Sequence, residues 1–128
     1  MDADNQTIYN LYIESQQREP ILWVSSNGTR IWGYTGDDGL RYYHRENGPA
    51  KEWVNGAKEW WLNGKLHRLD GPACEYLNGE KYWFIGDIEY TAERWAEQVL
   101  KLQNKPHDKQ AVQDFLRSIL KKDVEDAL

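Results

Sequence analysis

Cysteine is almost missing from this sequence: Cys74 is the only one among 128 residues, so no disulfide can form within the chain. No apolar run approaches the ~20 residues that a membrane-spanning helix needs. The first residues, from Met1 to Asp4, are acidic and polar, which is unlike a secretory signal peptide. These absences predict a protein of a reducing cytoplasm with no membrane association.

The usual signatures of metal and catalytic sites are missing too. No Cys-x-x-Cys or His-Glu-x-x-His spacing occurs, so structural zinc is not expected. Most glycines lie in Asn-Gly and Gly-Pro pairs instead of a phosphate-binding loop, and there is no Gly-x-Ser-x-Gly elbow. The loop that holds Asp37 and Asp38 lacks the ligand spacing of a calcium site. We therefore expect no metal, no cofactor and no catalytic residue.

Positive charge is also in short supply. The net charge is −5 and acidic and basic residues are well mixed, so no basic stripe is available for a nucleic-acid partner. Phenylalanine is rare, with two residues against seven tryptophans and eight tyrosines. Tryptophan and tyrosine pack and also offer a hydrogen bond, a combination that is enriched at protein interfaces.

What the sequence does contain is a tandem repeat. The segment 44–50, His-Arg-Glu-Asn-Gly-Pro-Ala, returns 23 residues later as His-Arg-Leu-Asp-Gly-Pro-Ala in 67–73. Asn55-Gly56 returns as Asn78-Gly79, and Trp60 returns as Trp83 at the same offset. A weaker third copy of the Asn-Gly-x-x-x-Trp spacing lies upstream in 27–32. A period of this length indicates a repeated supersecondary unit.

Each repeat reads as a β-hairpin. Asn-Gly between runs rich in aromatic residues predicts a two-residue type I′ turn, here at Asn55, Asn63 and Asn78. Gly86-Asp87 takes the place of Asn63-Gly64 in the second copy, and the Gly-Pro pairs interrupt strands. Residues 21–89 are therefore expected to form an antiparallel meander.

Two-residue turns also fix a register, in which Val54 faces Ala57 and Glu52 faces Glu59. One face then carries the predicted aromatic core, which consists of Ile21, Trp23, Trp32, Tyr34, Pro49, Trp53, Trp60, Leu62, Pro72, Cys74, Tyr76, Trp83 and Ile85. The opposite face mixes carboxylates with rings and is the predicted interaction face. Its residues are Glu52, Glu59, Trp61, Arg68, Glu75, Tyr82 and Phe84.

The repeated polar residues have two readings each. His44 and His67 occupy one repeat position, and the register places His67 opposite Trp60, which favours a packing role over a ligand contact. Arg45 and Arg68 either neutralise cross-strand glutamates, with Arg68 opposite Glu59, or contact a ligand. Cys74 alternates into the aromatic face, where a buried thiol is inert.

Helices flank the sheet. Residues 4–17 carry an apolar stripe of Ile8, Leu11 and Tyr12, with Asp4 or Asn5 as the N-cap. Residues 91–122 predict two helices, the first capped by Thr91, and 123–128 form an acidic tail that is expected to fray. The fold class is therefore α+β, one domain over 1–128: an antiparallel β-meander of repeated hairpins with one N-terminal and two C-terminal helices packed on the aromatic face.

The pattern His-Arg-x-Asp-Gly-Pro-Ala, four residues, Asn-Gly-x-x-x-Trp and then Asn-Gly resembles the hairpin repeats, loosely related to MORN repeats, of small phage-encoded and giant-virus proteins. The resemblance covers Arg41 to Tyr90 well and Ile21 to Tyr34 poorly, and this chain departs from it at Asn47 and at Gly86-Asp87. It implies an accessory protein of the host cytoplasm that binds and inhibits a host protein, such as a component of a defence system.

Three functions are compatible with these observations. The first is a non-enzymatic protein-interaction module with a host protein as its partner. The second is a small-ligand binder that sequesters a nucleotide with its rings and with Arg45 and Arg68, where His44 and His67 add ligand contacts. The third is a weak hydrolase, for which the paired carboxylates Glu52 and Glu59 would need a cleft. A homodimer is compatible with each, because an exposed sheet face or edge can self-associate.

Overall fold

The structure, a computed structural model, describes residues 4–15 and 18–127. It is an α+β fold in which a sheet of hairpins follows one helix and precedes two, as the sequence predicts. The elements are α1 (Asn5–Ser15), β1 (Ile21–Val24), β2 (Arg30–Thr35), β3 (Arg41–Tyr43), β4 (Lys51–Glu52), β5 (Lys58–Glu59), β6 (Trp61–Leu62), β7 (Lys65–Leu66), β8 (Cys74–Glu75), β9 (Lys81–Ile85), β10 (Ile88–Tyr90), α2 (Ala92–Leu102) and α3 (Lys109–Ala127).

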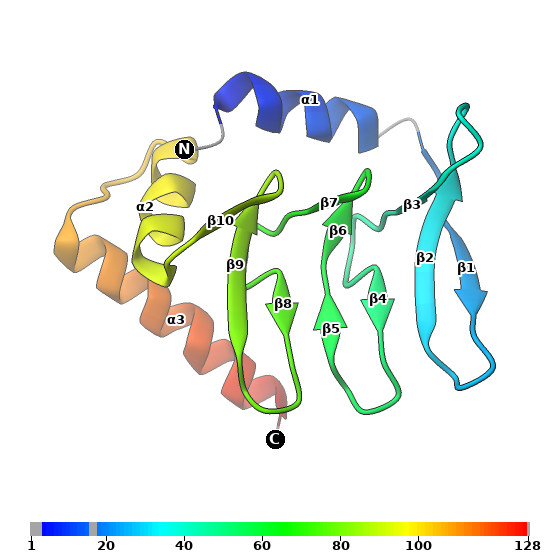
Figure 1. Cartoon of the computed structure of the whole chain (residues 1–128). Helices are drawn as coiled ribbons and strands as arrows, with labels where there is room; N and C mark the ends of the chain where they lie inside the picture. The colour runs from blue at the N-terminus through cyan, green and yellow to red at the C-terminus, as the bar shows by residue number, and fades with distance from the viewer. Residues whose placement is uncertain (1–3, 16–17, 128) are drawn as a thin grey trace.

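The strands form a meander. The main sheet has the order β1-β2-β4-β5-β8-β9-β10, and β3 pairs with the C-terminal part of β2. The described neighbouring strands are all antiparallel. Strands β6 and β7 make a separate two-stranded hairpin. In Figure 1, α1 runs above the tips of the β6–β7 and β9–β10 hairpins, whereas α2 and α3 lie beyond the β9 end of the sheet. The degenerate upstream copy therefore belongs to the same sheet as the two clear repeats.

The Asn-Gly pairs form two different turns. At Asn63-Gly64 both residues have positive φ, 49° and 77°, which is the predicted type I′ turn, and Gly86-Asp87 matches it with 54° and 70°. At Asn55-Gly56 only the glycine has positive φ, and Trp53 pairs with Ala57 across a three-residue loop. This loop is a type I turn followed by a bulged glycine, so the prediction of type I′ turns is wrong there and at the equivalent Asn78-Gly79.

The extra loop residue shifts the register by one. Glu52 lies opposite Lys58 and Lys51 lies opposite Glu59, so the predicted pair of like charges between Glu52 and Glu59 does not exist. Because side chains alternate with a period of two, a slip of one residue turns the whole first strand of each hairpin to the other face. The predicted aromatic core face is therefore divided between the two sides of the sheet, and Trp53 lies on the side opposite to Trp60.

One side of the sheet carries a row of alternating charge. Paired residues run across five strands in the order Arg30, Glu52, Lys58, Glu75 and Lys81, so each carboxylate faces a cation on both neighbouring strands. Opposite charges directly across a strand pair stabilise a sheet by a few tenths of a kcal/mol to about 1 kcal/mol. This row ties the three copies together.

The hydrophobic core lies at the C-terminal end of the sheet. Trp83 and Ile85 of β9 pack with Trp95 and Val99 of α2, and α3 closes the cluster with Leu116 and other apolar residues. Trp95 and Val99 are fully buried. The C-terminal helices thus cover the last tryptophan of the predicted aromatic series.

Local capping follows the predictions. Asp4 caps α1 by accepting a hydrogen bond from the Thr7 backbone at 2.6 Å, which also lowers the pKa of its carboxyl group. Thr91 caps α2 by accepting a hydrogen bond from the Arg94 backbone N–H at 3.2 Å.

In the predicted apolar stripe of α1, Leu11 is buried as predicted, but Tyr12 is 59% exposed and does not belong to the buried stripe.

The predicted helix ends differ at two places. Helix α1 ends at Ser15, and the next two residues of the predicted range 4–17 lie outside the described residues. Helix α3 continues to Ala127, so residues 123–127 of the predicted frayed tail are helical. The stretch contains neither glycine nor proline, and the helix therefore has no stop signal there.

Candidate functional site

The repeated histidines hold the hairpin tips. The Nδ1 atom of His44 accepts a hydrogen bond from the Asn63 backbone N–H at 2.9 Å, and that of His67 accepts one from the Gly86 backbone N–H at 3.0 Å. Each donor is the first residue of a type I′ turn. The backbone N–H of His67 bonds to the Trp60 carbonyl at 3.1 Å, which confirms the predicted pairing of these two residues.

Burial keeps His67 neutral. His44 has no exposed surface, and burial lowers the pKa of His67 from 6.5 to about 4. A neutral ring with Nδ1 as acceptor carries its proton on Nε2, which is the tautomer that this bonding pattern selects. The two rings bind separate turns and do not converge on one site.

The repeated arginine lies flat on the repeated tryptophan. The Cζ atom of Arg68 lies 3.7 Å from the centre of the Trp60 ring. Its Nε binds Asp70 at 2.8 Å, and its Nη1 binds both the Pro72 carbonyl at 3.0 Å and Glu75 at 3.2 Å. Three acceptors and one indole therefore fix a guanidinium group that is only 13% exposed.

Arg45 repeats this arrangement with one partner fewer. Its Cζ lies 3.8 Å from the Trp32 ring, and its Nη1 binds the Pro49 carbonyl at 3.2 Å and Glu52 at 3.4 Å. Asn47 stands where the other copy has an aspartate, so the second ion pair is missing. The side chain of Arg45 is correspondingly more exposed, at 29%. The repeated arginines do pair with sheet glutamates, but the predicted partner of Arg68, Glu59, is wrong. The partners are Glu52 and Glu75, each seven residues ahead of its arginine.

The glycine of Gly-Pro-Ala makes room for the arginine. A Cβ atom on Gly71 would lie 2.6 Å from Cζ of Arg68, and one on Gly48 would lie 3.1 Å from Cζ of Arg45. The motif His-Arg-x-x-Gly-Pro-Ala is thus a structural unit: the histidine binds a turn, the arginine covers an indole, and the glycine lets the loop close over the guanidinium. We call the side of the sheet that carries Trp32, Trp60, Trp83, Arg45 and Arg68 the arginine face.

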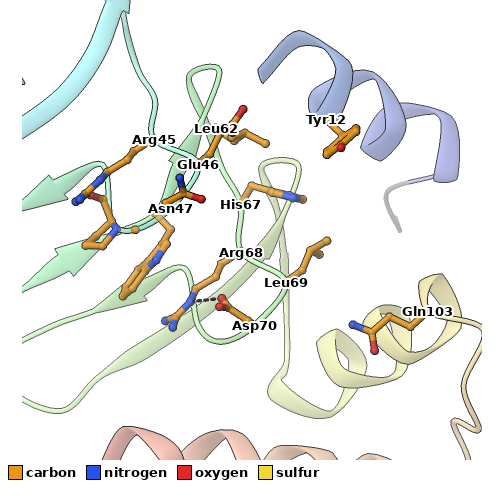
Figure 2. Close-up of a pocket in the computed structure, with 13 residues that line it drawn as sticks. Tyr12, Arg45, Glu46, Asn47, Leu62, His67, Arg68, Leu69, Asp70 and Gln103 are labelled. Atoms are coloured by element: carbon orange, nitrogen blue, oxygen red, sulfur yellow. Dashed lines mark hydrogen bonds and ion pairs between the residues drawn. The ribbon is translucent and has the colours of Figure 1, made fainter. Parts of the chain in front are cut away.

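A groove of about 810 Å³ lies between the two repeated loops of the arginine face (Figure 2). Tyr12 of α1 and Gln103, just after α2, stand at its rim. The lining residues are Tyr12, Arg45, Glu46, Asn47, Gly48, Pro49, Trp60, Leu62, His67, Arg68, Leu69, Asp70 and Gln103. The two arginines are balanced by Glu46 and Asp70 and are already bound within the fold. The groove therefore offers little electrostatic preference for an anion.

The other side of the sheet is organised around a glutamate. Glu59 accepts hydrogen bonds from Trp61 Nε1 at 2.9 Å and from the Tyr76 hydroxyl at 2.8 Å. Burial and the bond to Glu59 raise the pKa of Tyr76, so its hydroxyl group stays a donor. The Tyr76 ring packs edge-on against Trp53 and Tyr82, with centroids 6.4 Å and 5.8 Å apart. We call this side, with Trp53, Glu59, Trp61, Tyr76 and Tyr82, the glutamate face.

A hollow of about 480 Å³ opens where the glutamate face meets the Asn-Gly loops. Its walls are Trp53 and Tyr76, and the two loops that flank it extend to Asn55 and Asn78. The first loop residues, Val54 and Leu77, are each 72% exposed. Apolar side chains that project this far from equivalent turns cannot serve the core of the chain.

The predicted interaction residues are divided by the register shift. Glu59, Trp61, Tyr82 and Phe84 lie together on the glutamate face. Glu52 and Glu75 lie on the arginine face because of this shift. Arg68 lies there because β7 ends at Leu66 and the arginine covers Trp60, so the prediction that groups these three with the others is wrong. Trp53 and Tyr76 belong to the glutamate face, so the prediction that places them in the aromatic core is wrong. The reason is that an Asn-Gly pair does not reveal the length of its loop.

Cys74 and the acidic loop show no reactive arrangement. Cys74 is 2% exposed, and burial raises the pKa of its thiol to about 11. Asp38 accepts hydrogen bonds from the Tyr42 hydroxyl and the Leu40 backbone, and these bonds lower the pKa of its carboxyl group. Within residues 4–15 and 18–127, no three His, Cys, Asp or Glu side chains are grouped as a metal site would require.

No helix in these same ranges is both long and apolar enough to cross a membrane. The comparisons with protein-family models, curated proteins and solved structures returned no match.

Proposed function

We propose that this protein is a non-enzymatic interaction module that binds another protein through its glutamate face. The observation that carries the proposal is the hollow lined by Trp53, Tyr76 and the exposed Leu77, with the exposed Val54 on the neighbouring loop. Interface centres are rich in tryptophan and tyrosine, and a fixed ring loses little conformational entropy on binding.

Glu59 supports the proposal by fixing the rings before a partner arrives. It holds Trp61 and Tyr76 by hydrogen bonds, and Tyr76 in turn packs on Trp53 and Tyr82. A preorganised surface of this kind favours a partner that inserts an apolar or aromatic side chain into the hollow.

The resemblance to phage hairpin-repeat proteins extends the proposal to the class of partner. By that analogy the partner is a host protein, and binding inhibits it in the host cytoplasm. The acidic net charge of −5 fits a protein partner better than a nucleic acid.

Affinity capture from host cells tests the proposal. The wild-type chain is compared with the double variant Val54→Asp and Leu77→Asp, whose changes lie at exposed loop positions and leave the core intact. The control carries Leu40→Asp and Leu120→Asp, which are also exposed, at 61% and 40%, but lie elsewhere. We expect quantitative mass spectrometry to show a specific host protein with wild type and control, and its loss with the first variant. Equal recovery by all three proteins would reject the glutamate face.

Binding of a nucleotide, the alternative function, can be tested by the melting temperature of the protein. Nη1 of Arg45 and both Nε and Nη1 of Arg68 already donate to carboxylates and carbonyls, which favours protein binding over phosphate binding. We therefore expect millimolar cyclic or linear nucleotides to leave the melting temperature unchanged. A rise that is lost on Arg45→Gln would favour the small-ligand function instead.

A further inference from the structure

One end of the sheet is covered by helices, whereas the other end is an open edge strand. At the β10 end, α2 and α3 cover the last hairpin and form the core. At the other end, β1 pairs only with β2 among the described strands. Its sequence is Ile-Leu-Trp-Val, and Ile21, Leu22 and Val24 are 56%, 42% and 61% exposed. Repeat arrays normally end in a polar or covered terminal unit, and this end has neither.

Strand β1 also lacks the devices that protect a sheet edge. It contains no charged residue and no proline, and its pairing with β2 runs without a bulge from Ile21–Gly33 to Val24–Arg30. Natural edge strands usually carry a lysine, a proline or a bulge that prevents pairing with another chain. A regular apolar edge is therefore a surface on which another strand can add.

The hydrogen-bonding groups that face outward follow from the ladder. The Ser25 backbone N–H bonds to the Thr29 carbonyl at 2.9 Å, so Ser25 points toward β2. Backbone groups alternate along an antiparallel strand, so Trp23 also points toward β2, whereas Leu22 and Val24 present their N–H and C=O groups to the open edge.

We propose that β1 pairs with β1 of a second copy of this chain, antiparallel across a two-fold axis at Trp23. In this register Leu22 of each copy exchanges backbone hydrogen bonds with Val24 of the other. The two Trp23 residues meet as a pair without hydrogen bonds, the arrangement in which side chains lie closest. The sheet then continues through both chains.

Neighbouring registers are worse, which is why the proposal specifies this one. Centring the axis on Leu22 places Val24 against Pro20, which has no N–H to donate. Centring it on Val24 places Leu22 against Ser26, which lies in a turn. The register at Trp23 brings no two charged residues of 20–26 together, because that segment has none. The edge is thus complementary to itself, which a two-fold interface requires.

Sedimentation velocity over a dilution series tests this association. A four-residue strand buries a small area, so we expect a dimer of twice 15.1 kDa that dissociates on dilution through the micromolar range. Val24→Pro removes an outward N–H without removing a bond to β2 and is expected to weaken dimerisation at least tenfold. Val54→Pro is the matched control, since proline suits that turn position, and it should associate like wild type. A monomer at every concentration, or equal association of both variants, overturns the proposal.

Cross-linking tests the register and does not depend on how well Val24→Pro folds. Paired Cα atoms without hydrogen bonds lie within disulfide range, so Trp23→Cys should form a covalent dimer under mild oxidation. Leu22→Cys is the control, because it faces Val24 of the other copy, and the buried Cys74 can stay in place. We expect at least tenfold faster cross-linking for Trp23→Cys, and equal rates would contradict the two-fold axis at Trp23.

Discussion

Trp32 and Trp60 differ from Trp83 in what covers them, although all three hold the same repeat position. Arginine guanidinium groups lie over the first two, at 3.8 Å and 3.7 Å from the ring centres. Trp83 is covered by Trp95 of α2, with ring centroids 4.7 Å apart. The copies that contain Trp32 and Trp60 thus close their own arginine face, whereas the copy that contains Trp83 needs a helix.

The sequence change behind this difference is small. Counting 23 residues on from His67 and Arg68 leads to Tyr90 and Thr91. Tyr90 is buried in the core cluster, and Thr91 is the N-cap of α2. A residue that covers an indole is thus replaced by one that starts a helix. The repeat ends where its arginine is lost, and the hydrophobic core begins there.

Removing the helical cover is expected to have the largest effect. Trp95 is fully buried and its Nε1 donates a hydrogen bond to the Arg68 carbonyl at 2.9 Å. Trp95→Ala should lower the free energy of unfolding by about 3–5 kcal/mol, measured by urea denaturation. A loss below about 1 kcal/mol would mean that Trp83 is covered by something other than this helix.

Acid should have the next largest effect, because His67 is buried in its neutral form. The unfolded chain takes up a proton at His67 below pH 6.5, whereas the folded chain does so only near pH 4. The contribution to stability is therefore complete above pH 6.5, and falls by up to about 1.4 kcal/mol per pH unit between 6.5 and 4.

The matched variant for this acid effect is His67→Asn, which keeps a hydrogen-bond acceptor near Gly86 without a titrating ring. Chemical denaturation between pH 4 and 7 should give a shallower slope for the variant. Parallel curves for the two proteins would show that His67 is not held neutral by the fold.

Loss of the flat arginine cover should cost less than loss of Trp95. Arg68→Lys keeps the charge but loses the planar stack on Trp60 and the fork that reaches Asp70 and Glu75, so we expect a loss of about 1–2 kcal/mol. Arg45→Lys should cost less, because its group is more exposed and has no aspartate partner. Thermal unfolding of both variants gives the order, and a reversed order would contradict the role of the Arg68–Asp70 ion pair.

The smallest effect should come from the loop glycines. Gly71→Ala places a Cβ atom 2.6 Å from the guanidinium carbon of Arg68, whereas Gly48→Ala places one at 3.1 Å from that of Arg45. We expect losses of about 1 kcal/mol and of a few tenths, respectively, since a side-chain end can move at the expense of its contacts. Equal melting temperatures for Gly71→Ala and wild type would show that the loop has room to spare.

Local signals in the sequence were sufficient for the element order. The hairpins, the type I′ turn at Asn63-Gly64 and the caps at Asp4 and Thr91 depend on neighbouring residues alone, and all of them are present. The pairing of His67 with Trp60 followed from the same turn. These features need no knowledge of tertiary packing.

Local signals do not determine which side chains share a face of the sheet. Asn-Gly fits a two-residue loop and equally a three-residue loop with a bulged glycine, and the two differ by one residue of register. This difference in register decides whether Trp53 and Trp60 lie on the same side of the sheet or on opposite sides. The acceptors of Arg68 were likewise hidden, because Glu75 comes within reach only when the Gly-Pro loop folds back.

The most direct test of the glutamate face is the dissociation constant of the captured partner protein. Val54→Asp with Leu77→Asp changes the hollow of the glutamate face, and Asn47→Ala with Gln103→Ala changes the groove of the arginine face. We expect isothermal titration calorimetry to show at least tenfold weaker binding for the first pair and a change within twofold for the second. The reverse result would place the partner in the groove and contradict binding through the glutamate face.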